Sequence, residues 1–110
     1  MSVGRPNLAE LLTKLVASSA EIREEGAENV CDWSESFDDF EAKVAVRVLS
    51  AVAAAESDAK AREAQINAIV EIFDASSMDI GDIAPVFSIG GDDLGPSERI
   101  YLVELREKLE

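Results

Sequence analysis

The fold is decided by residues 36–55, which read SFDDFEAKVAVRVLSAVAAA. Ser36 suits the capping position of a helix. After the first turn, only Lys43, Arg47 and Ser50 interrupt the apolar residues. A helix that is apolar nearly all round is usually buried at the centre of a domain, so we expect a central helix here. Its main apolar face comprises Phe37, Phe40, Val44, Val48, Ala51, Val52 and Ala55.

Another helix is expected before this one, over residues 7–25. Apolar residues recur through it at the i, i+3, i+4, i+7 spacing of a helix with one buried face. Asn7 can cap its start together with Glu10, and Gly26 is the residue type that most often ends a helix. Residues 27–35 would then connect the two helices.

Two more helices and one short helix are expected further along the chain. Residues 59–75 carry an apolar inward face, and Pro96 suits the first position of a last helix. Between them, residues 78–89 contain Pro85, which allows a short helical turn followed by a loop. No stretch shows the periodicity of a strand. The sequence therefore predicts an all-α fold, a four-helix bundle-like domain with one short extra helix, in which residues 1–110 form a single domain.

Net charge limits the kinds of partner that the protein can bind. The chain carries 23 acidic and 10 basic side chains, a formal charge of −13. Nucleic acids and anionic membranes are bound through Lys and Arg, so we expect neither as a partner. A basic protein is the partner that this charge favours. The chain has no apolar run of ~18 residues and no signal-like start, so we expect a cytoplasmic protein, monomeric or homodimeric.

Residue types that support catalysis are sparse. The chain has no His, the commonest general base and zinc ligand. Its one cysteine, Cys31, has no Cys or His partner and lies among carboxylates that disfavour the thiolate. Residues 90–93 lack the alternating oxygen ligands and closing Glu of a calcium loop, and we interpret them as a solvated turn. We expect no enzymatic activity, no cofactor and no metal site.

One cluster of charge is denser than its surroundings: residues 21–41 hold nine acidic side chains and a single basic one, Arg23. Charges are screened over ~8 Å at physiological salt, so this density costs folding stability that a basic partner would relieve. Glu24, Glu25 and Glu28 would also lie at the C-terminal end of the first helix, where the dipole disfavours them. An aromatic ring within an acidic rim is typical of a protein-binding hot spot. The candidate partner-binding residues are Glu21, Glu24, Glu25, Glu28, Asp32, Trp33, Glu35, Asp38 and Asp39.

Small size, helices, absent catalytic residues and the acidic cluster together resemble the small acidic immunity proteins of bacterial toxin systems. Such proteins are antitoxins that neutralise colicin-type or contact-dependent toxins, many of them basic nucleases. The resemblance implies that residues 21–41 cover a Lys- and Arg-lined surface of a toxin. Two alternatives stay open. An acidic DNA mimic would need two rows of carboxylates at phosphate-like spacing. A self-associating regulatory or scaffold protein would use the small side chains of residues 51–55 and the exposed side of the helix expected over residues 59–75.

Overall fold

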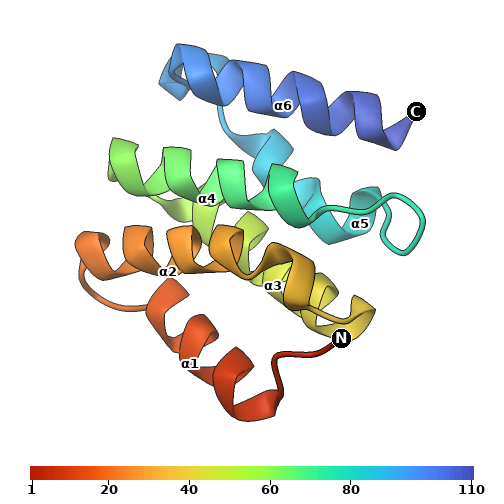
Figure 1. Ribbon diagram of the computed structural model, residues 1–110. Helices are drawn as coiled ribbons and strands as arrows, with labels where there is room; N and C mark the ends of the chain where they lie inside the picture. Colours follow the sequence, from red (N-terminus) through yellow and green to blue (C-terminus); the bar gives the residue numbers. More distant parts are fainter.

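The structure consists of helices and turns, with no strand. The computed structural model describes every residue from Met1 to Glu110, and 76% of the chain is helical. The α-helices are α1 (Arg5–Leu15), α2 (Ala20–Asp32), α3 (Asp39–Ala55), α4 (Ala59–Ile72), α5 (Ile80–Ile83) and α6 (Pro96–Leu109) (Figure 1). Three 3-10 turns accompany them: Ser34–Ser36, Ala84–Ser88 and Gly91–Asp93. The predicted all-α class is confirmed.

The helices form two layers, with α4 at the centre. In Figure 1, α1, α2, α4 and α6 follow one another in the front layer, and α3 and α5 lie behind them. α4 packs against α2, α3 and α6, so it is the central helix in place of the one predicted over residues 36–55. The molecule is flat, with extents of 38 × 35 × 19 Å. The largest fully buried apolar side chains are Leu15, Leu49, Ile66, Ile69, Ile83 and Leu105.

The single helix expected over residues 7–25 is wrong, because two helices, α1 and α2, occupy this part of the chain. A turn at residues 16–19 separates them. The Ser19 side chain caps α2, and Arg23 donates hydrogen bonds to two carbonyl oxygens of the turn at 2.9 and 3.0 Å. Both helices bury residues in the same core. The apolar spacing therefore continues across the break and does not reveal it.

Gly26 lies inside α2, and the prediction that it ends a helix is wrong. It is buried where α1 and α2 meet. A Cβ atom on Gly26 would lie 2.8 Å from the Cβ of Lys14 and 3.2 Å from the backbone nitrogen of Leu15. Glycine is required because the two helices approach too closely for a side chain. α2 therefore runs on to Asp32, through much of the connection expected at residues 27–35.

Helix α3 buries a different face from the predicted one. Its buried apolar residues are Ala45, Val46, Leu49 and Ala53. Phe40, placed by the sequence on the core face, is 54% exposed, and the Arg5 guanidinium lies 5.0 Å from its ring centroid. The helix also begins later than expected. Asp38 and Glu41 cap it reciprocally, which leaves Ser36 in the preceding 3-10 turn.

The remaining helices lie near their predicted positions, although α4 ends at Ile72 and not at residue 75, and the 3-10 turn Ala84–Ser88 occupies part of the predicted loop. The inward residues of α4 and its end are buried, as expected: Ile66, Ile69, Val70, Ile72 and Phe73. α5 is the predicted short helical turn, capped by Asp79 and Asp82, and α6 begins at Pro96. The chain thus has five longer helices and the short α5, one helix more than predicted. None of the helices has the length and hydropathy that crossing a membrane would require.

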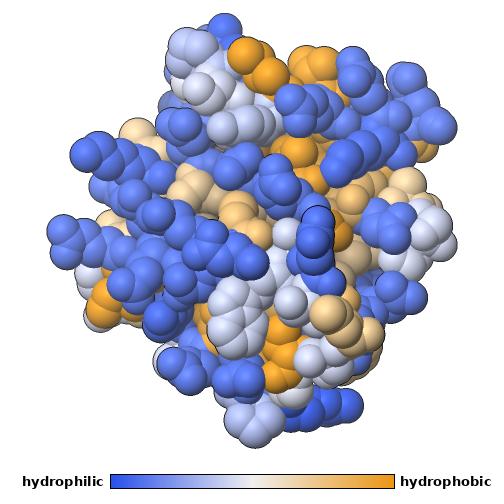
Figure 2. Space-filling model, viewed as in Figure 1, coloured by the Kyte–Doolittle hydropathy of each residue, from blue (hydrophilic) through white to orange (hydrophobic).

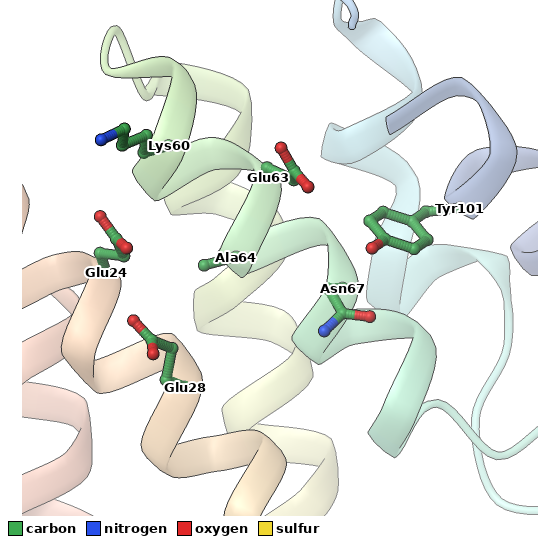
Figure 3. Close-up of a pocket in the computed structure, with 7 residues that line it drawn as sticks. All are labelled: Glu24, Glu28, Lys60, Glu63, Ala64, Asn67 and Tyr101. Atoms are coloured by element: carbon green, nitrogen blue, oxygen red, sulfur yellow. The ribbon is translucent and has the colours of Figure 1, made fainter. Parts of the chain in front are cut away.

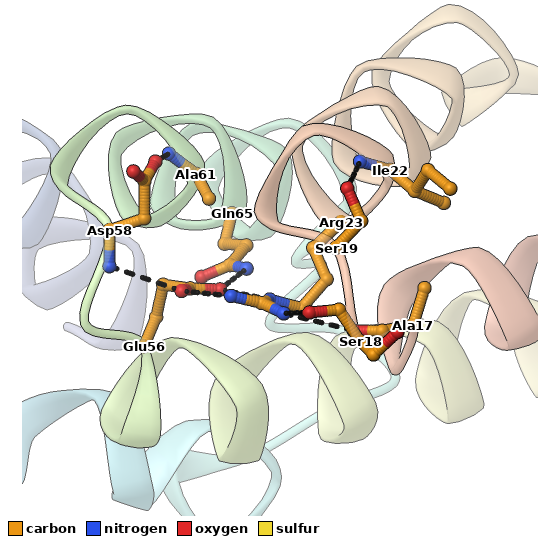
Figure 4. A network of polar contacts seen from close by, with 9 residues as sticks. All are labelled: Ala17, Ser18, Ser19, Ile22, Arg23, Glu56, Asp58, Ala61 and Gln65. Atoms are coloured by element: carbon orange, nitrogen blue, oxygen red, sulfur yellow. Dashed lines mark hydrogen bonds and ion pairs between the residues drawn. The ribbon is translucent and has the colours of Figure 1, made fainter.

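A polar network joins the α1–α2 turn to the loop between α3 and α4 (Figure 4). Glu56, whose side chain is 1% exposed, accepts hydrogen bonds from Nε and Nη2 of Arg23 at 2.7 and 2.8 Å. Gln65 donates to the same carboxylate at 2.8 Å, and the backbone N–H of Asp58 donates at 3.1 Å. The Arg23 guanidinium, followed by these donors, lowers the pKa of Glu56 to about 2.

Three other carboxylates, those of Glu41, Asp82 and Glu98, are buried at joints between elements. Arg47 pairs with Asp82 at 2.6 Å and fastens α5 to α3. Glu41 accepts three hydrogen bonds from residues 2–4 and ties this segment to α3. Burial alone would raise the pKa of Asp82 and Glu98, but hydrogen bonds from backbone and arginine outweigh it, so both pKa values are lowered.

These carboxyls make the fold sensitive to acid. A carboxyl with a lowered pKa stabilises the folded state above its unfolded pKa, and this stabilisation is lost as the pH falls toward the folded pKa. For Glu56 the window runs from 4.5 down to about 2. We expect the free energy of unfolding to decline across this window in the wild type. Glu56→Gln should flatten the decline.

Urea unfolding followed by circular dichroism at several pH values checks this prediction. The matched control is Glu21→Gln, because Glu21 is exposed and makes no ion pair. This control should keep the wild-type pH dependence. A decline as steep in Glu56→Gln as in the wild type would contradict the role assigned to the network.

Candidate protein-interaction surface

The acidic side chains of α2 form a row on one side of the helix. Glu21, Glu24, Glu28 and Asp32 follow one another at intervals of three or four residues, which places them on the same helix face. Glu24 is half-buried and the other three are exposed. Because α2 packs against α4, the row borders the outer surface of α4. We call these four residues, together with Glu63 of α4, the acidic face.

A shallow pocket of about 250 Å³ lies where the acidic face meets α6. Figure 3 shows two carboxylates projecting from α2, with Lys60, Glu63 and Asn67 on α4 and the Tyr101 ring across from them on α6. The full lining is Glu24, Glu28, Lys60, Glu63, Ala64, Asn67 and Tyr101. The pocket thus combines three carboxylates with one ammonium group, one amide and one aromatic ring.

The carboxylates of this pocket have no cationic partner within the protein. The four ion pairs of the structure lie elsewhere, and Lys60 takes part in none of them. Carboxylates that line one pocket repel one another, because salt screens charges only over ~8 Å. Carboxylates accept strong hydrogen bonds from guanidinium and ammonium groups. The pocket therefore has the chemistry to receive a basic side chain from outside.

Two of the predicted site residues, Glu25 and Trp33, lie apart from the acidic face, near α1. Glu25 pairs with Lys14 of α1 at 3.1 Å. Trp33 is 39% exposed. It lines a separate pocket with Asn7, Glu10, Leu11, Lys14 and Asn29. The only tryptophan is therefore not at the centre of the acidic face, and the ring beside the carboxylates belongs to Tyr101.

The last three candidates, Glu35, Asp38 and Asp39, lie around the start of α3. Asp38 caps this helix by accepting a hydrogen bond from the backbone N–H of Glu41 at 2.7 Å. Asp39 lies in the first turn, where the helix dipole favours negative charge. Glu35 is exposed in the 3-10 turn Ser34–Ser36. Helix capping thus accounts for Asp38 and Asp39 without any partner.

The helix boundaries also change the electrostatic argument for the cluster. Glu24, Glu25 and Glu28 all lie before the last turn of α2, which ends at Asp32, so the dipole opposes them less than the sequence suggested. Asp32 is the last residue of α2, and no basic residue lies in the last turn. The unfavourable interaction between a carboxylate and the C-terminal end of the helix dipole therefore applies most strongly to Asp32 and less to these glutamates.

Sequence reasoning did not connect Glu63, Asn67 and Tyr101 with the acidic row of α2. The helical pattern places Glu63 and Asn67 on the solvated face of α4, and it places Tyr101 beside the core leucines of the last helix. No motif pairs these positions with α2. The packing of α4 between α2 and α6 brings the three segments together.

Cys31 lies half-buried near the end of the acidic row. Burial raises the pKa of its thiol to about 11, with smaller contributions from Glu71, Asp32 and Glu28. A thiol with this pKa is protonated at neutral pH and is a poor nucleophile. No group of three or more His, Cys, Asp or Glu side chains is arranged to hold a metal ion.

No protein family, no curated protein and no solved structure matches this chain. Any functional conclusion therefore depends on the geometry of the acidic face.

Proposed function

We propose that the chain is a non-enzymatic protein-binding module, an immunity protein that neutralises a basic toxin domain through its acidic face. A nuclease is a suitable target, because an enzyme that binds nucleic acid needs a surface lined by Lys and Arg. The acidic face would occupy that surface and exclude the nucleic acid. Carboxylates would then contact the basic side chains that otherwise bind phosphates.

The observation that carries this proposal is the placement of the basic side chains. Eight of the ten contact other groups of the same chain, four of them in ion pairs: Arg5, Lys14, Arg23, Arg47, Arg62, Arg99, Arg106 and Lys108. None of the four ion pairs involves a carboxylate of the acidic face. The carboxylates of the acidic face stay unpaired, and their charge can act on a partner. Such a field steers association toward ~10⁸ M⁻¹s⁻¹ at low salt.

A DNA mimic is less well supported by the same geometry. The row on α2 is continuous, but the corresponding row on α4 reads Lys60, Glu63, Asn67 and Glu71. A lysine and an amide therefore interrupt the second row. A DNA mimic has to reproduce the charge that a duplex backbone carries at every nucleotide. The interrupted second row does not reproduce it, so we favour a toxin domain as the partner over mimicry of DNA.

Self-association is the alternative that one observation favours. Ala51, Ala54 and Ala55 are exposed on α3, and Val16 is 63% exposed. A mainly apolar hollow is bordered by Val16, Val52 and Ala55. Light scattering on the pure protein distinguishes the two proposals, because a stable dimer that Ala55→Asp disrupts would support self-association.

Protection of cells tests the immunity proposal. The proposal expects a toxin gene immediately upstream, and the partner to be tested is the C-terminal domain of that toxin, produced together with this chain. We expect the cells to survive and the two proteins to co-purify. Cell death, or failure to co-purify, would refute the proposal.

Two triple variants with equal changes in net charge show whether the acidic face is responsible. Glu21→Lys, Glu24→Lys and Glu28→Lys combined should abolish protection. Glu10→Lys, Glu35→Lys and Asp39→Lys combined should preserve it, because these side chains are exposed away from the acidic face. Circular dichroism confirms that both variants are folded.

A further inference from the structure

Helices α1 and α2 form a V whose open end holds a second pocket. The two helices come closest at Gly26, where a Cβ atom would lie 2.8 Å from the Cβ of Lys14. From there they diverge toward the start of α1 and the end of α2 (Figure 1). In Figure 2, hydrophobic atoms are visible between α1 and α2 among hydrophilic side chains. The pocket measures about 270 Å³ and is lined by Asn7, Glu10, Leu11, Lys14, Asn29 and Trp33.

Two amides of this pocket have fixed orientations and hydrogen-bonding groups that stay available. The Lys14 ammonium donates to Oδ1 of Asn29 at 2.9 Å. Because an ammonium group only donates, this bond directs the Nδ2 donors of Asn29 elsewhere, where a ligand can use them. Nδ2 of Asn7 donates to the carbonyl oxygen of Val3 at 2.8 Å, which leaves Oδ1 of Asn7 as an acceptor. The pocket therefore offers a donor from α2 and an acceptor from α1.

Charge in this pocket is balanced, because its lining holds one carboxylate and one ammonium group. The Lys14 ammonium already pairs with Glu25 at 3.1 Å, so it does not require an anion from outside. Glu10 is exposed and serves as a further hydrogen-bond acceptor. An anionic ligand would also be repelled by the net charge of −13. The pocket thus suits an uncharged ligand with several polar groups.

The apolar part of the pocket comes from Leu11 and Trp33. Leu11 is buried, whereas 39% of the Trp33 surface is exposed. An indole ring contributes a large apolar area to any ligand that covers it. The volume lies just below the range of ~300–1,000 Å³ that is typical of drug-sized ligands. A ligand of a single ring therefore matches the pocket in size.

We infer that this pocket binds a single uncharged sugar ring, with Trp33 as its apolar platform. A pyranose has C–H groups on its faces, which cover the indole, and hydroxyls around its rim, each of which donates and accepts. These hydroxyls accept hydrogen bonds from Asn29 and donate to Asn7 and Glu10. The polar groups of the pocket come from two helices, which fits hydroxyls that project around a ring better than the coplanar edge of a nucleobase. The inference is independent of the proposed function, because this pocket lies apart from the acidic face.

Fluorescence of Trp33 reports binding directly, because it is the only tryptophan of the chain. The probes are D-glucose, D-galactose and N-acetyl-D-glucosamine, each titrated separately. We expect at least one of them to change the Trp33 emission saturably, with a millimolar Kd. The 6-phosphate of the same sugar should bind more weakly, because the acidic protein repels it.

Two matched Asn→Asp variants locate the site. Asn29→Asp keeps the acceptor for Lys14 but removes the donors to the sugar, so it should weaken binding at least about fivefold, as expected for one lost hydrogen bond. Asn67→Asp makes the same change in the acidic pocket and should leave the affinity unchanged. Asn7→Ala removes the acceptor on α1 and should also weaken binding. Melting temperatures confirm that each variant is folded.

Three outcomes would overturn the inference. The first is the absence of a saturable change in emission with any of the three sugars. The second is equal weakening by Asn29→Asp and Asn67→Asp, which would mean that added negative charge, and not the lost donor, disturbs binding. The third is tighter binding of adenosine than of every sugar, which would assign the pocket to a flat aromatic ring. None of these outcomes bears on the proposed function, and failure of the toxin domain to bind would leave the sugar site intact.

Discussion

Replacing Arg62 with Met is expected to lower the free energy of unfolding by about 3 kcal/mol, the lower end of the range for removing one partner of a buried ion pair. Arg62 donates two hydrogen bonds to the Glu98 carboxylate, at 2.7 and 3.1 Å, and it also donates to the carbonyl oxygen of Asp93. The two paired side chains are 13% and 5% exposed. Methionine would leave the Glu98 carboxylate buried without a cation. It would also loosen the attachment of α6, which carries Tyr101.

Urea unfolding compares this variant with two controls. Adding Glu98→Gln to Arg62→Met removes the stranded charge and should recover part of the lost stability. Arg106→Met removes an exposed arginine that lies over the Phe87 ring at 5.1 Å, and it should cost no more than ~1 kcal/mol. If Arg62→Met unfolded at the same urea concentration as the wild type, the ion pair would not hold α6 to α4.

Gly26→Ala is expected to destabilise the protein by about 1–2 kcal/mol, although alanine is the better helix former. The gain in helix propensity is at most ~1 kcal/mol, and it is outweighed by the clash of the new methyl group, which would lie 2.8 Å from the Cβ of Lys14. Backbone of α1 lies almost as near, so a side-chain rotation cannot relieve the contact. The two helices must separate, at a cost typical of an overpacked core.

Thermal unfolding tests the Gly26 prediction against a glycine in open space. A Cβ on Gly91 would have no neighbour within 4 Å, so Gly91→Ala should leave the melting temperature close to that of the wild type. If Gly26→Ala were as stable as the wild type, the close approach of α1 and α2 would not be what requires glycine at this position.

The helical class and most helix positions could be predicted because they depend on local rules. The short helical turn expected before Pro85 is α5, and Pro96 starts α6 as expected. The α1–α2 break could not be predicted, because it depends on Arg23, which reaches back to the turn while pairing with Glu56. Glu56 is more than thirty residues away in the sequence, and no local pattern indicates that contact.

The candidate site was predictable only in part, for the same physical reason. The spacing of Glu21, Glu24 and Glu28 along one helix predicts a shared face. The sequence also suggested Trp33 as the centre of that face. Trp33 follows the last residue of α2 and packs near α1 instead. Tyr101 reaches the acidic pocket through tertiary packing alone.

If the acidic face attracts a basic partner protein, the rate constant of association depends strongly on the salt concentration. Stopped-flow fluorescence would give the association rate constant of the toxin domain with the wild type and with Glu24→Lys/Glu28→Lys over a range of ionic strengths. The wild-type rate constant should fall steeply as salt is added, while the variant should associate more slowly at low salt and respond much less to salt. Equal rate constants with equal salt dependence in the two proteins would contradict this role of the acidic face.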